Sequence, residues 1–211
     1  YFCSFCTIPL ARGRSRSASI EKTLGEAKAV AKIGAKEVVL TGVNIGDFGK
    51  EKNENFLGLI KGLDTISDIE RYRISSIEPN LLTDAIIEFV AKSDKFVPHF
   101  HIPLQSGSDE LLQSMRRRYG TELYRNRISK IKTLMPDCCI GMDVIVGYPG
   151  ETASSFLKTV EFIKEMEPAY LHVFTYSERN NTTAVRMSGS VPLATRKERS
   201  KILRLLSSKL K

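Results

Sequence analysis

Apolar and polar positions follow two periods along this chain, one typical of helices and one typical of buried strands. Ile20, Leu24 and Val30 recur at helical spacing after Ser19, a residue type that caps helices. The β-branched run at 37–41 predicts a buried strand. The alternation continues, with helices predicted at 55–66, 83–91, 108–134 (two stretches broken near Gly120), 152–166 and 193–211, and extended segments at 72–76, 99–104, 139–147 and 170–176. Strand starts recur at intervals of about 30 to 40 residues, the length of a βα unit.

Strands that alternate with amphipathic helices predict a parallel sheet with right-handed crossovers. Doubly wound sheets and barrels both fit this order. Polar residues at or near the predicted carboxyl ends of the strands favour a barrel, because barrel chemistry lies at that rim; they are Thr41 to Asn44, Ser75 and Ser76, Gln105, Asp143, and Tyr176 with Ser177. Five strands are too few for a closed eight-stranded barrel. The fold class predicted is therefore α/β: a partial, open (β/α) barrel of parallel strands with outer helices.

Charge and composition bear on the partners and the cellular compartment of the protein. The chain holds 32 Lys and Arg against 24 Asp and Glu, a net charge of +8. This excess favours phosphate-rich partners and solubility equally. No apolar run approaches the about 20 residues of a membrane span, and the N-terminus has no export signal. The four cysteines do not suggest a disulfide scaffold, so we expect a reduced, cytoplasmic protein. Because the first residue is Tyr, we also expect the sequence to begin inside a longer protein.

The pair Cys3-x-x-Cys6 is ambiguous by its spacing. Half of a zinc site and a redox pair are both open. A zinc site needs two further Cys or His ligands, and Cys138-Cys139 at the start of a strand has poor geometry for that role. A thioredoxin-like pair opens a helix directly after a strand, whereas Pro9 and an Arg-rich stretch follow here.

The residues around the pair add a resemblance. The segments that carry it are YFCSFCTIPLARG at 1–13, LTGVNIG at 40–46, SSIEP at 75–79, HIPLQSGS at 101–108, MRRRY at 115–119, GMDVIVGYPGET at 141–152 and LHVFTYS at 171–177. They resemble, in order and over nearly the whole chain, the signatures of the radical S-adenosylmethionine (SAM) methylthiotransferases. Within that family, 41–46 and 75–80 are most similar to the MtaB branch, which adds a methylthio group to threonylcarbamoyladenosine beside the tRNA anticodon. The nearest rivals are the MiaB branch, which acts on isopentenyladenosine, and the RimO branch, which acts on a ribosomal-protein aspartate.

The resemblance implies a [4Fe-4S] cluster ligated by Cys3 and Cys6. The family's first cysteine would lie two residues before Tyr1, and three thiolates would leave one iron open for SAM. An electron from the cluster then breaks the sulfonium bond and gives a 5′-deoxyadenosyl radical. The resemblance also implies SAM or substrate contacts: the Phe5 backbone near the adenine; Thr41, Gly42 and Asn44 near the methionine end; Gln105 and Asp143 facing ribose or substrate; Val144, Phe174 and Tyr176 around the adenine.

The same resemblance implies an organisation and partners. Residues 1–192 would form the radical SAM core, with the first strand upstream, and 193–211 a helix that links to an RNA-binding domain. An N-terminal domain with a second [4Fe-4S] cluster would be missing, so we expect this fragment to cleave SAM at most. The partners implied are the tRNA anticodon arm and an electron donor; no membrane is involved, and the oligomeric state is open.

Other interpretations remain. Asp143 is equally well explained as a buried structural group. His172 fits a core residue better than a ligand, and the run Arg116 to Arg118 fits a solvated helix face as well as a phosphate contact. A non-catalytic zinc or redox barrel, or an RNA-binding module without a cluster, are the hypotheses from other classes of protein.

Overall fold

The computed structural model describes residues 2–210. Tyr1, which opens the cysteine segment, and Lys211, which ends the predicted tail, lie outside the described residues. The chain forms two compact units. Unit 1 contains 2–14, Ile102–Ile128 and 140–210, and unit 2 contains Ser15–His101 and Ser129–Cys139.

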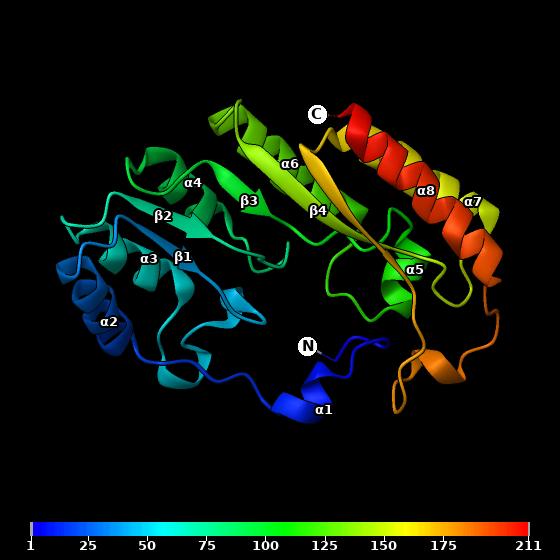
Figure 1. Cartoon of the computed structure of the whole chain (residues 1–211), viewed down its shortest axis with the longest axis horizontal. Coiled ribbons are helices and arrows are strands. Elements are labelled where there is room, and N and C mark those ends of the chain that lie inside the picture. Colours follow the sequence, from blue (N-terminus) through cyan, green and yellow to red (C-terminus); the bar gives the residue numbers. More distant parts are fainter. Residues whose placement is uncertain (1, 211) are drawn as a thin grey trace. The chain divides into compact units, whose positions relative to one another are not determined.

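Unit 2 is a parallel sheet with its helices (Figure 1). Its elements are α2 (Ile20–Lys32), β1 (Glu37–Leu40), the short 3-10 helices η1 (Ile45–Asp47) and η2 (Lys50–Lys52), α3 (Phe56–Asp64), β2 (Arg71–Ile74), α4 (Asp84–Lys92) and β3 (His99–His101). β1 pairs in parallel with β2 from Glu37 opposite Arg71, and Ser76 forms a parallel bridge with His101 of β3. The parallel direction of the strands predicted for this region is therefore confirmed.

Local signals place the helices of unit 2. Ser19 Oγ accepts a hydrogen bond from the Lys22 N–H at 3.2 Å, and Asn55 Oδ1 accepts one from the Gly58 N–H at 2.8 Å. Both are N-caps, which satisfy donors that a helix start leaves free. α3 packs against α2 through small residues: a Cβ on Gly62 would lie 3.0 Å from Leu24 Cδ1. Glycine at this position permits the close approach of the two helices.

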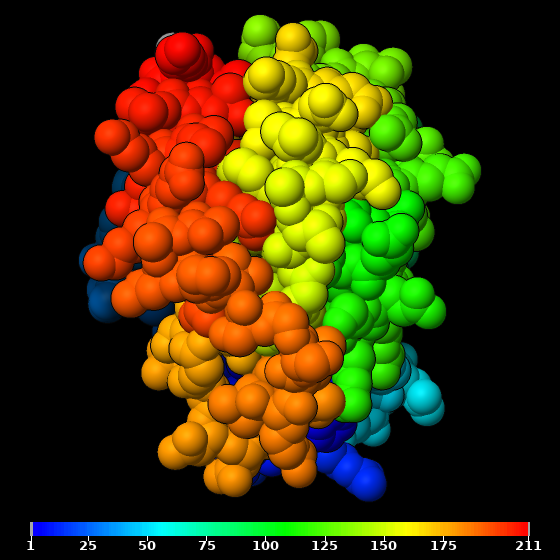
Figure 2. Space-filling model, turned by 90° about the vertical axis from the view of Figure 1, so that its right-hand side faces the viewer, coloured from blue at the N-terminus to red at the C-terminus, as the bar shows by residue number. Residues whose placement is uncertain are grey.

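Unit 1 repeats the parallel strand and helix order. Its elements are α1 (Ile8–Arg12), α5 (Asp109–Ser114), the first half of α6 (Thr121–Leu134), β4 (Cys139–Val146) from residue 140, α7 (Ala153–Met166), β5 (Tyr170–Thr175), η3 (Ala184–Arg186) and α8 (Leu193–Lys209). β4 and β5 pair in parallel from Gly141 opposite Tyr170 to Val146 opposite Thr175. α8 packs on β5, and Figure 2 shows it, in red, beside α7, in yellow.

The segment after β3 also runs along β4. The Ile102 N–H donates to Gly141 O at 2.9 Å, and the Leu104 N–H to Asp143 O at 3.1 Å. Ile102, Leu104 and Val144 have no exposed surface, so this part of the sheet lies in the core of unit 1. The predicted extended segment at 99–104 is thus confirmed, although only its first three residues count as a strand.

Two local predictions differ from the structure. Ile8–Arg12 forms a helix that the sequence did not suggest; Pro9 is tolerated there because the first turn of a helix needs no N–H donor. Arg116 to Arg118 do not lie on a helix face, because α5 ends at Ser114 and Arg116 has a left-handed backbone (φ +59°). The run forms the turn between α5 and α6.

A turn at 147–150 leads from β4 into α7. Gly147 has φ +77°, and a Cβ there would lie 2.2 Å from Arg196 Cγ. Only glycine fits both requirements. Thr152 Oγ1 then caps α7 by accepting a hydrogen bond from the Ser155 N–H at 3.1 Å. Among residues 2–210, no helix has the length and apolarity needed to cross a membrane.

Candidate functional site

Cys3 and Cys6 lie in one tight turn at the start of unit 1. The Cys6 N–H donates to Cys3 O at 3.1 Å, and α1 begins two residues later at Ile8. Neither cysteine forms a disulfide within the described residues, and both are of intermediate exposure. The turn therefore brings the two cysteines together and leaves both thiols partly exposed, as a shared metal centre requires.

Ser4, between the two cysteines, anchors this turn in the core. It is 2% exposed, and its Oγ lies 2.7 Å from the hydroxyl of Tyr148. The Ser4 N–H donates to Met115 O at 3.2 Å, and Ser4 O accepts from the Ala184 N–H at 2.8 Å. All the polar groups of this buried residue are satisfied, so the turn has a fixed place in unit 1. No pattern in the sequence indicates this role of Ser4.

Aromatic rings extend from the cysteine turn into the core of unit 1. The Phe5 ring meets Tyr148 edge to face with centroids 6.4 Å apart, and Tyr148 meets Tyr176 in the same way at 5.8 Å. Burial, followed by the charge of Glu178 and by Tyr148, raises the pKa of Tyr176. The Tyr176 hydroxyl is buried and has no hydrogen-bond partner in the described residues. It is therefore a protonated donor available to a ligand.

Gln105 is a second incompletely bonded residue of unit 1, and its backbone is strained. Its backbone has φ +67°, a conformation that is costly for a residue with a side chain and that recurs at functional sites. The backbone is held there because the Gln105 N–H donates to Asp143 O at 2.8 Å and Gln105 O accepts from the Ile145 N–H at 3.0 Å. The side chain is 9% exposed, and its Oε1 lacks a partner in the part of the chain described.

The two faces of β4 and β5 separate the other predicted residues. Asp143 is paired with His172 across the strands, and His172 Nδ1 lies 3.3 Å from Asp143 Oδ1. His172 is 54% exposed, so its interpretation as a core residue is wrong. Side chains alternate along a strand, and His172 shares its open face with Phe174, which is 51% exposed.

Val144 lies on the other face. It is fully buried opposite Val173, so its side chain does not share a face with Asp143 or Phe174. Only its backbone can belong to a site on the open face. Their positions near the ends of the strands place these residues together in the sequence, but the alternation of side chains puts them on different faces.

The remaining predicted residues lie in unit 2. Thr41 and Gly42 are exposed directly after β1, and Asn44 precedes η1. Asn44 Nδ2 donates to Asp47 Oδ2 at 2.5 Å, whereas its buried Oδ1 has no partner within residues 2–210. The loop after β1 thus contains the 3-10 turn η1 and one amide oxygen able to accept a further hydrogen bond.

The comparisons with known proteins bear on this arrangement. The model of the family described as "Radical SAM superfamily" matches residues 1–163. The chain belongs to the radical SAM superfamily. A threonylcarbamoyladenosine tRNA methylthiotransferase MtaB from Bacillus subtilis (strain 168) is 45% identical over 211 residues, which are 99% of this chain and 47% of that protein. A tRNA-2-methylthio-N(6)-dimethylallyladenosine synthase from Desulfitobacterium hafniense (strain Y51) is 38% identical over 94% of this chain and 45% of that protein.

The chain therefore spans about half the length of the curated relatives that it matches. Solved structures agree on the fold. The radical SAM methyltransferase TsrM from Kitasatospora setae, with cobalamin and a [4Fe-4S] cluster bound, matches with a TM-score of 0.74 at 14% identity, over 88% of this chain and 36% of that chain. Coproporphyrinogen III oxidase (HemN) from Escherichia coli matches with a TM-score of 0.66 at 15% identity, over all of this chain and 50% of that one. The predicted fold class, a partial α/β barrel of the radical SAM type, is confirmed.

The cysteine turn fits a radical SAM cluster better than the second cysteine pair does. A metal ligand must be a thiolate, and burial, followed by the neighbouring Cys139, raises the pKa of Cys138 to about 12. Cys3 instead has a cation beside it, since Arg117 Nη1 lies 2.9 Å from Cys3 Sγ. The cysteine turn, the unsatisfied acceptor Gln105 Oε1 and the unsatisfied Tyr176 hydroxyl are groups of unit 1 that suit a cluster and a polar cofactor.

Proposed function

We propose that this chain is the radical SAM core of a transferase that 2-methylthiolates N6-threonylcarbamoyladenosine beside the tRNA anticodon. The observation that carries the proposal is the identity of 45% to an MtaB protein over 99% of this chain, together with a cysteine turn in unit 1 whose two thiols are partly exposed. Relatives that act on dimethylallyladenosine are 38 to 41% identical. That modification is the second candidate, and the 45% identity to the MtaB from Bacillus subtilis favours the first.

The proposed cofactors are a [4Fe-4S] cluster and SAM. Cys3 and Cys6 bind the cluster, and a third cysteine precedes Tyr1. When bound, these cofactors supply the one-electron cleavage that yields a 5′-deoxyadenosyl radical. The protein positions the ligands. Ser4 and its hydrogen-bond partners fix the turn, so the two thiols would already be in place when the cluster binds.

The other predicted residues have proposed roles that match their surroundings. In unit 1, the Gln105 amide and the Tyr176 hydroxyl would bind polar groups of SAM, because both are buried with an unsatisfied atom. The exposed Phe174 ring would contribute an apolar surface for the adenine, and Asp143 would face ribose or substrate. In unit 2, Thr41, Gly42 and Asn44 would bind the methionine end. The Phe5 and Val144 backbones would add contacts to the adenine.

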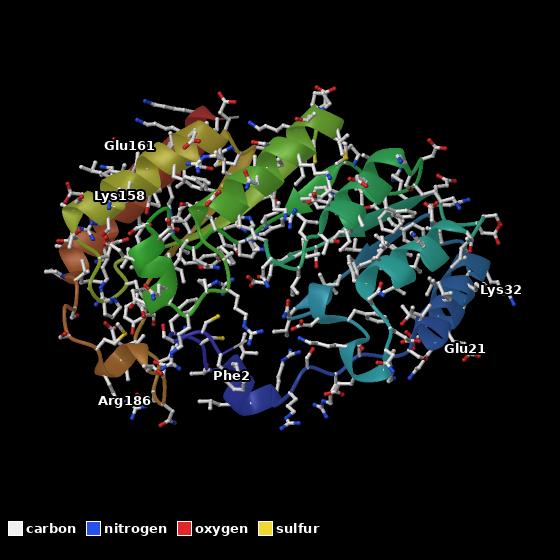
Figure 3. All side chains as sticks on the ribbon, turned by 180° about the vertical axis from the view of Figure 1, so that it is seen from behind. Phe2, Glu21, Lys32, Lys158, Glu161 and Arg186 are labelled. Atoms are coloured by element: carbon white, nitrogen blue, oxygen red, sulfur yellow. The ribbon has the colours of Figure 1, made fainter. Side chains whose placement is uncertain are left out.

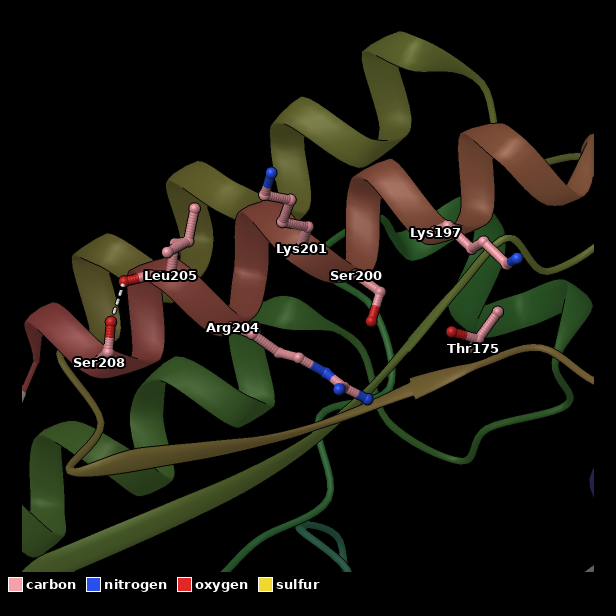
Figure 4. A pocket seen from close by; sticks show the side chains of 7 residues that line it. All are labelled: Thr175, Lys197, Ser200, Lys201, Arg204, Leu205 and Ser208. Carbon is pink, nitrogen blue, oxygen red and sulfur yellow. Dashed lines mark hydrogen bonds between the residues drawn. The ribbon is translucent and has the colours of Figure 1, made fainter.

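The proposed partner is tRNA, and α8 carries a surface that suits it. Lys197, Lys201 and Arg204 recur at helical spacing on one side of α8. They line a hollow of about 600 Å³, shown in Figure 4, with Thr175, Ser200, Leu205 and Ser208. No acidic residue belongs to that lining, and within residues 2–210 neither lysine forms an ion pair.

The other arginines of α8 have inward roles. Arg196 Nη2 donates to Glu178 at 2.7 Å, and Arg199 Nη1 to Glu151 at 2.6 Å. Both arginines are buried and neutralised by carboxylates. The charge of α8 is thus divided between structural pairs inside and uncompensated cations outside. Uncompensated cations beside hydroxyl groups are the donors that bind RNA phosphates.

We further propose the organisation and location of the whole protein. Residues 1–192 are the radical SAM core, and 193–211 link it to a domain that binds RNA. A second [4Fe-4S] cluster lies in an N-terminal domain. The protein acts in the cytoplasm, where tRNA is modified. Residues 1–211 alone would cleave SAM without methylthiolation, because the sulfur-carrying cluster is not part of this segment.

The experiment that tests the reaction uses the gene that encodes this chain. Deleting it in its host and digesting total tRNA to nucleosides should remove 2-methylthio-threonylcarbamoyladenosine while the unmethylthiolated nucleoside accumulates. Complementation with the intact gene should restore the product, and complementation with a Cys6→Ala gene should not. Loss of the methylthio-isopentenyladenosine product instead would favour the second candidate. Retention of both products would contradict the proposed function.

A further inference from the structure

We propose that Arg117 is a positioning residue of the cluster: its guanidinium holds the Cys3 sulfur and sets the reduction potential of the cluster bound there. The inference rests on the proposed cluster ligation by Cys3. Arg117 Nη1 lies 2.9 Å from Cys3 Sγ, although the two residues are 114 positions apart. No motif of the sequence pairs these residues; the run of three arginines indicated only a basic segment.

The guanidinium is held on its other side by Tyr119. Arg117 Nε donates to the Tyr119 hydroxyl at 3.1 Å, and the guanidinium carbon lies 5.1 Å from the centre of the Tyr119 ring. The Tyr119 hydroxyl in turn donates to Pro103 O at 2.7 Å, and the ring is 7% exposed. A planar group with donors in a fixed fork can satisfy two partners at once, which a lysine ammonium on a flexible stem cannot do with the same geometry.

The backbone of Arg117 is equally fixed. Its N–H donates to Leu112 O at 2.9 Å, and the Arg116 N–H donates to Gln113 O at 2.9 Å. With Arg116 at φ +59°, these two bonds form a Schellman motif at the end of α5. A side chain other than glycine in the left-handed conformation costs about 1 kcal/mol. This strained cap fixes the backbone of the next residue, Arg117, so that its side chain reaches Cys3.

The same end of α5 also binds the residue beside Cys3. Met115 O, one residue before the strained arginine, accepts the Ser4 N–H at 3.2 Å. The cysteine turn is therefore attached to α5 at two points, by the backbone at Ser4 and by the guanidinium at Cys3. A change at Arg117 releases the second point and leaves the first intact.

A fixed positive charge next to a ligating sulfur has a defined electrostatic effect. Reduction adds one negative charge to a cluster, and a neighbouring cation stabilises the more negative state. Hydrogen bonds to the sulfurs act in the same direction and are a principal means by which proteins tune iron–sulfur clusters. Arg117 supplies both, so it raises the potential above the value that the same ligands would give without it.

Four forms of the full-length protein test this inference. Arg117→Gln removes the charge and the fork, Arg117→Lys keeps the charge, and Tyr119→Phe keeps the guanidinium but removes its anchor. Arg116→Gln is the matched control, since it removes one charge from the adjacent, exposed position. After anaerobic reconstitution, the potential is measured by redox titration monitored by electron paramagnetic resonance, without and with SAM, and iron release to a chelator is timed.

We expect Arg117→Gln to shift the potential to more negative values in the absence of SAM and to release iron about tenfold faster. Tyr119→Phe should shift it less in the same direction, Arg117→Lys should lie between parent and Arg117→Gln, and Arg116→Gln should match the parent. If Arg117→Gln does not fold, more negative potentials in both Tyr119→Phe and Arg117→Lys, with Arg116→Gln at the parent value, support the inference, and parent values in both contradict it. Equal potentials in all forms, or a loss confined to SAM affinity, would overturn the inference. A parent protein without a four-iron cluster would instead contradict the proposed function.

Discussion

The Ser4 hydroxyl lies 2.7 Å from the Tyr148 hydroxyl, although 144 positions separate the two residues. Tyr148 follows β4 in the turn at 147–150, and its hydroxyl also donates to Ser114 O at 3.0 Å. Tyr148 is fully buried. The place of the cysteine turn is thus set by a tyrosine at the end of a distant strand, through one hydroxyl that joins the turn, α5 and β4.

Removing that hydroxyl should loosen the turn. In Tyr148→Phe, Ser4 keeps its backbone bonds but loses its side-chain partner in a buried position, and we expect a loss of about 1 to 2 kcal/mol in the free energy of unfolding. Iron bound per chain after reconstitution should fall as well. Urea unfolding and iron analysis measure the two effects. Ser208→Ala, which removes an exposed hydroxyl bonded only within α8, should change neither quantity. Full iron content in Tyr148→Phe would mean that the hydroxyl does not position the turn.

The buried ion pair between α8 and the turn before α7 should be a strong determinant of stability. Glu151 and Arg199 have side chains that are 2% and 10% exposed, and Glu151 Oε2 also accepts the Gly147 N–H at 2.7 Å. Burial raises the pKa of Glu151, while the Gly147 N–H and Arg199 oppose that rise. Glu151→Gln leaves the guanidinium buried without its counter-charge, so we expect a loss of about 3 kcal/mol by chemical denaturation.

An exposed pair provides the control for Glu151→Gln. Arg125 Nε lies 2.6 Å from Glu165 Oε1 at the surface. Water screens such a pair, and Glu165→Gln should leave the unfolding midpoint unchanged. Equal effects of the two glutamine variants would show that burial does not decide the contribution of the pair.

Stability should depend on pH through His99 in β3. Burial, followed by the charges of Arg73 and His101, lowers the pKa of His99 below its usual value of 6.5. The unfolded chain then binds a proton at a pH where the folded chain does not, and the free energy of unfolding falls as the pH drops below about 6.5. The stability that this histidine contributes is present above that pH. Denaturation curves between pH 7 and pH 5.5 span that value of about 6.5. In His99→Gln, the free energy of unfolding should depend less steeply on pH over this range. An unchanged pH dependence in this variant would mean that other groups cause it.

The α8 surface should determine the electrostatic part of tRNA binding. Lys197→Gln combined with Lys201→Gln should weaken binding and reduce the slope of log affinity against log salt by about 2, because each lysine on a phosphate contributes about one unit. The matched control removes two exposed lysines from α7, Lys158 and Lys164; Lys158 is labelled in Figure 3. Filter binding at several salt concentrations gives both slopes. Equal slopes for the two double variants would place the RNA elsewhere.

How far the sequence predicts this structure depends on the range of the interactions. Helix starts at Ser19, Asn55 and Thr152 were predictable, because a cap bonds to a residue three positions away. The parallel strand order followed from the regular βα spacing. Local patterns also suggested that Arg116 to Arg118 belong to a helix face, which the Schellman motif at the end of α5 contradicts.

The site required contacts that sequence spacing does not contain. Cys3 was identified by the residues around it, whereas Arg117, which contacts Cys3, and Tyr148, which contacts its neighbour Ser4, lie more than 100 positions away. His172 was misplaced because an apolar strand with one open face resembles a fully buried one in sequence. A basic residue between two others gives no signal that it contacts a thiol.

The central claim is that the cysteine turn holds the cluster that cleaves SAM. The most direct measurement is the 5′-deoxyadenosine formed from SAM by the full-length protein, reconstituted anaerobically with iron and sulfide and reduced with dithionite. We predict 5′-deoxyadenosine and methionine in equal amounts from the parent and from Cys139→Ala, and none from Cys6→Ala. A four-iron parent that forms no 5′-deoxyadenosine, or a Cys6→Ala protein that forms as much as the parent, would contradict this account.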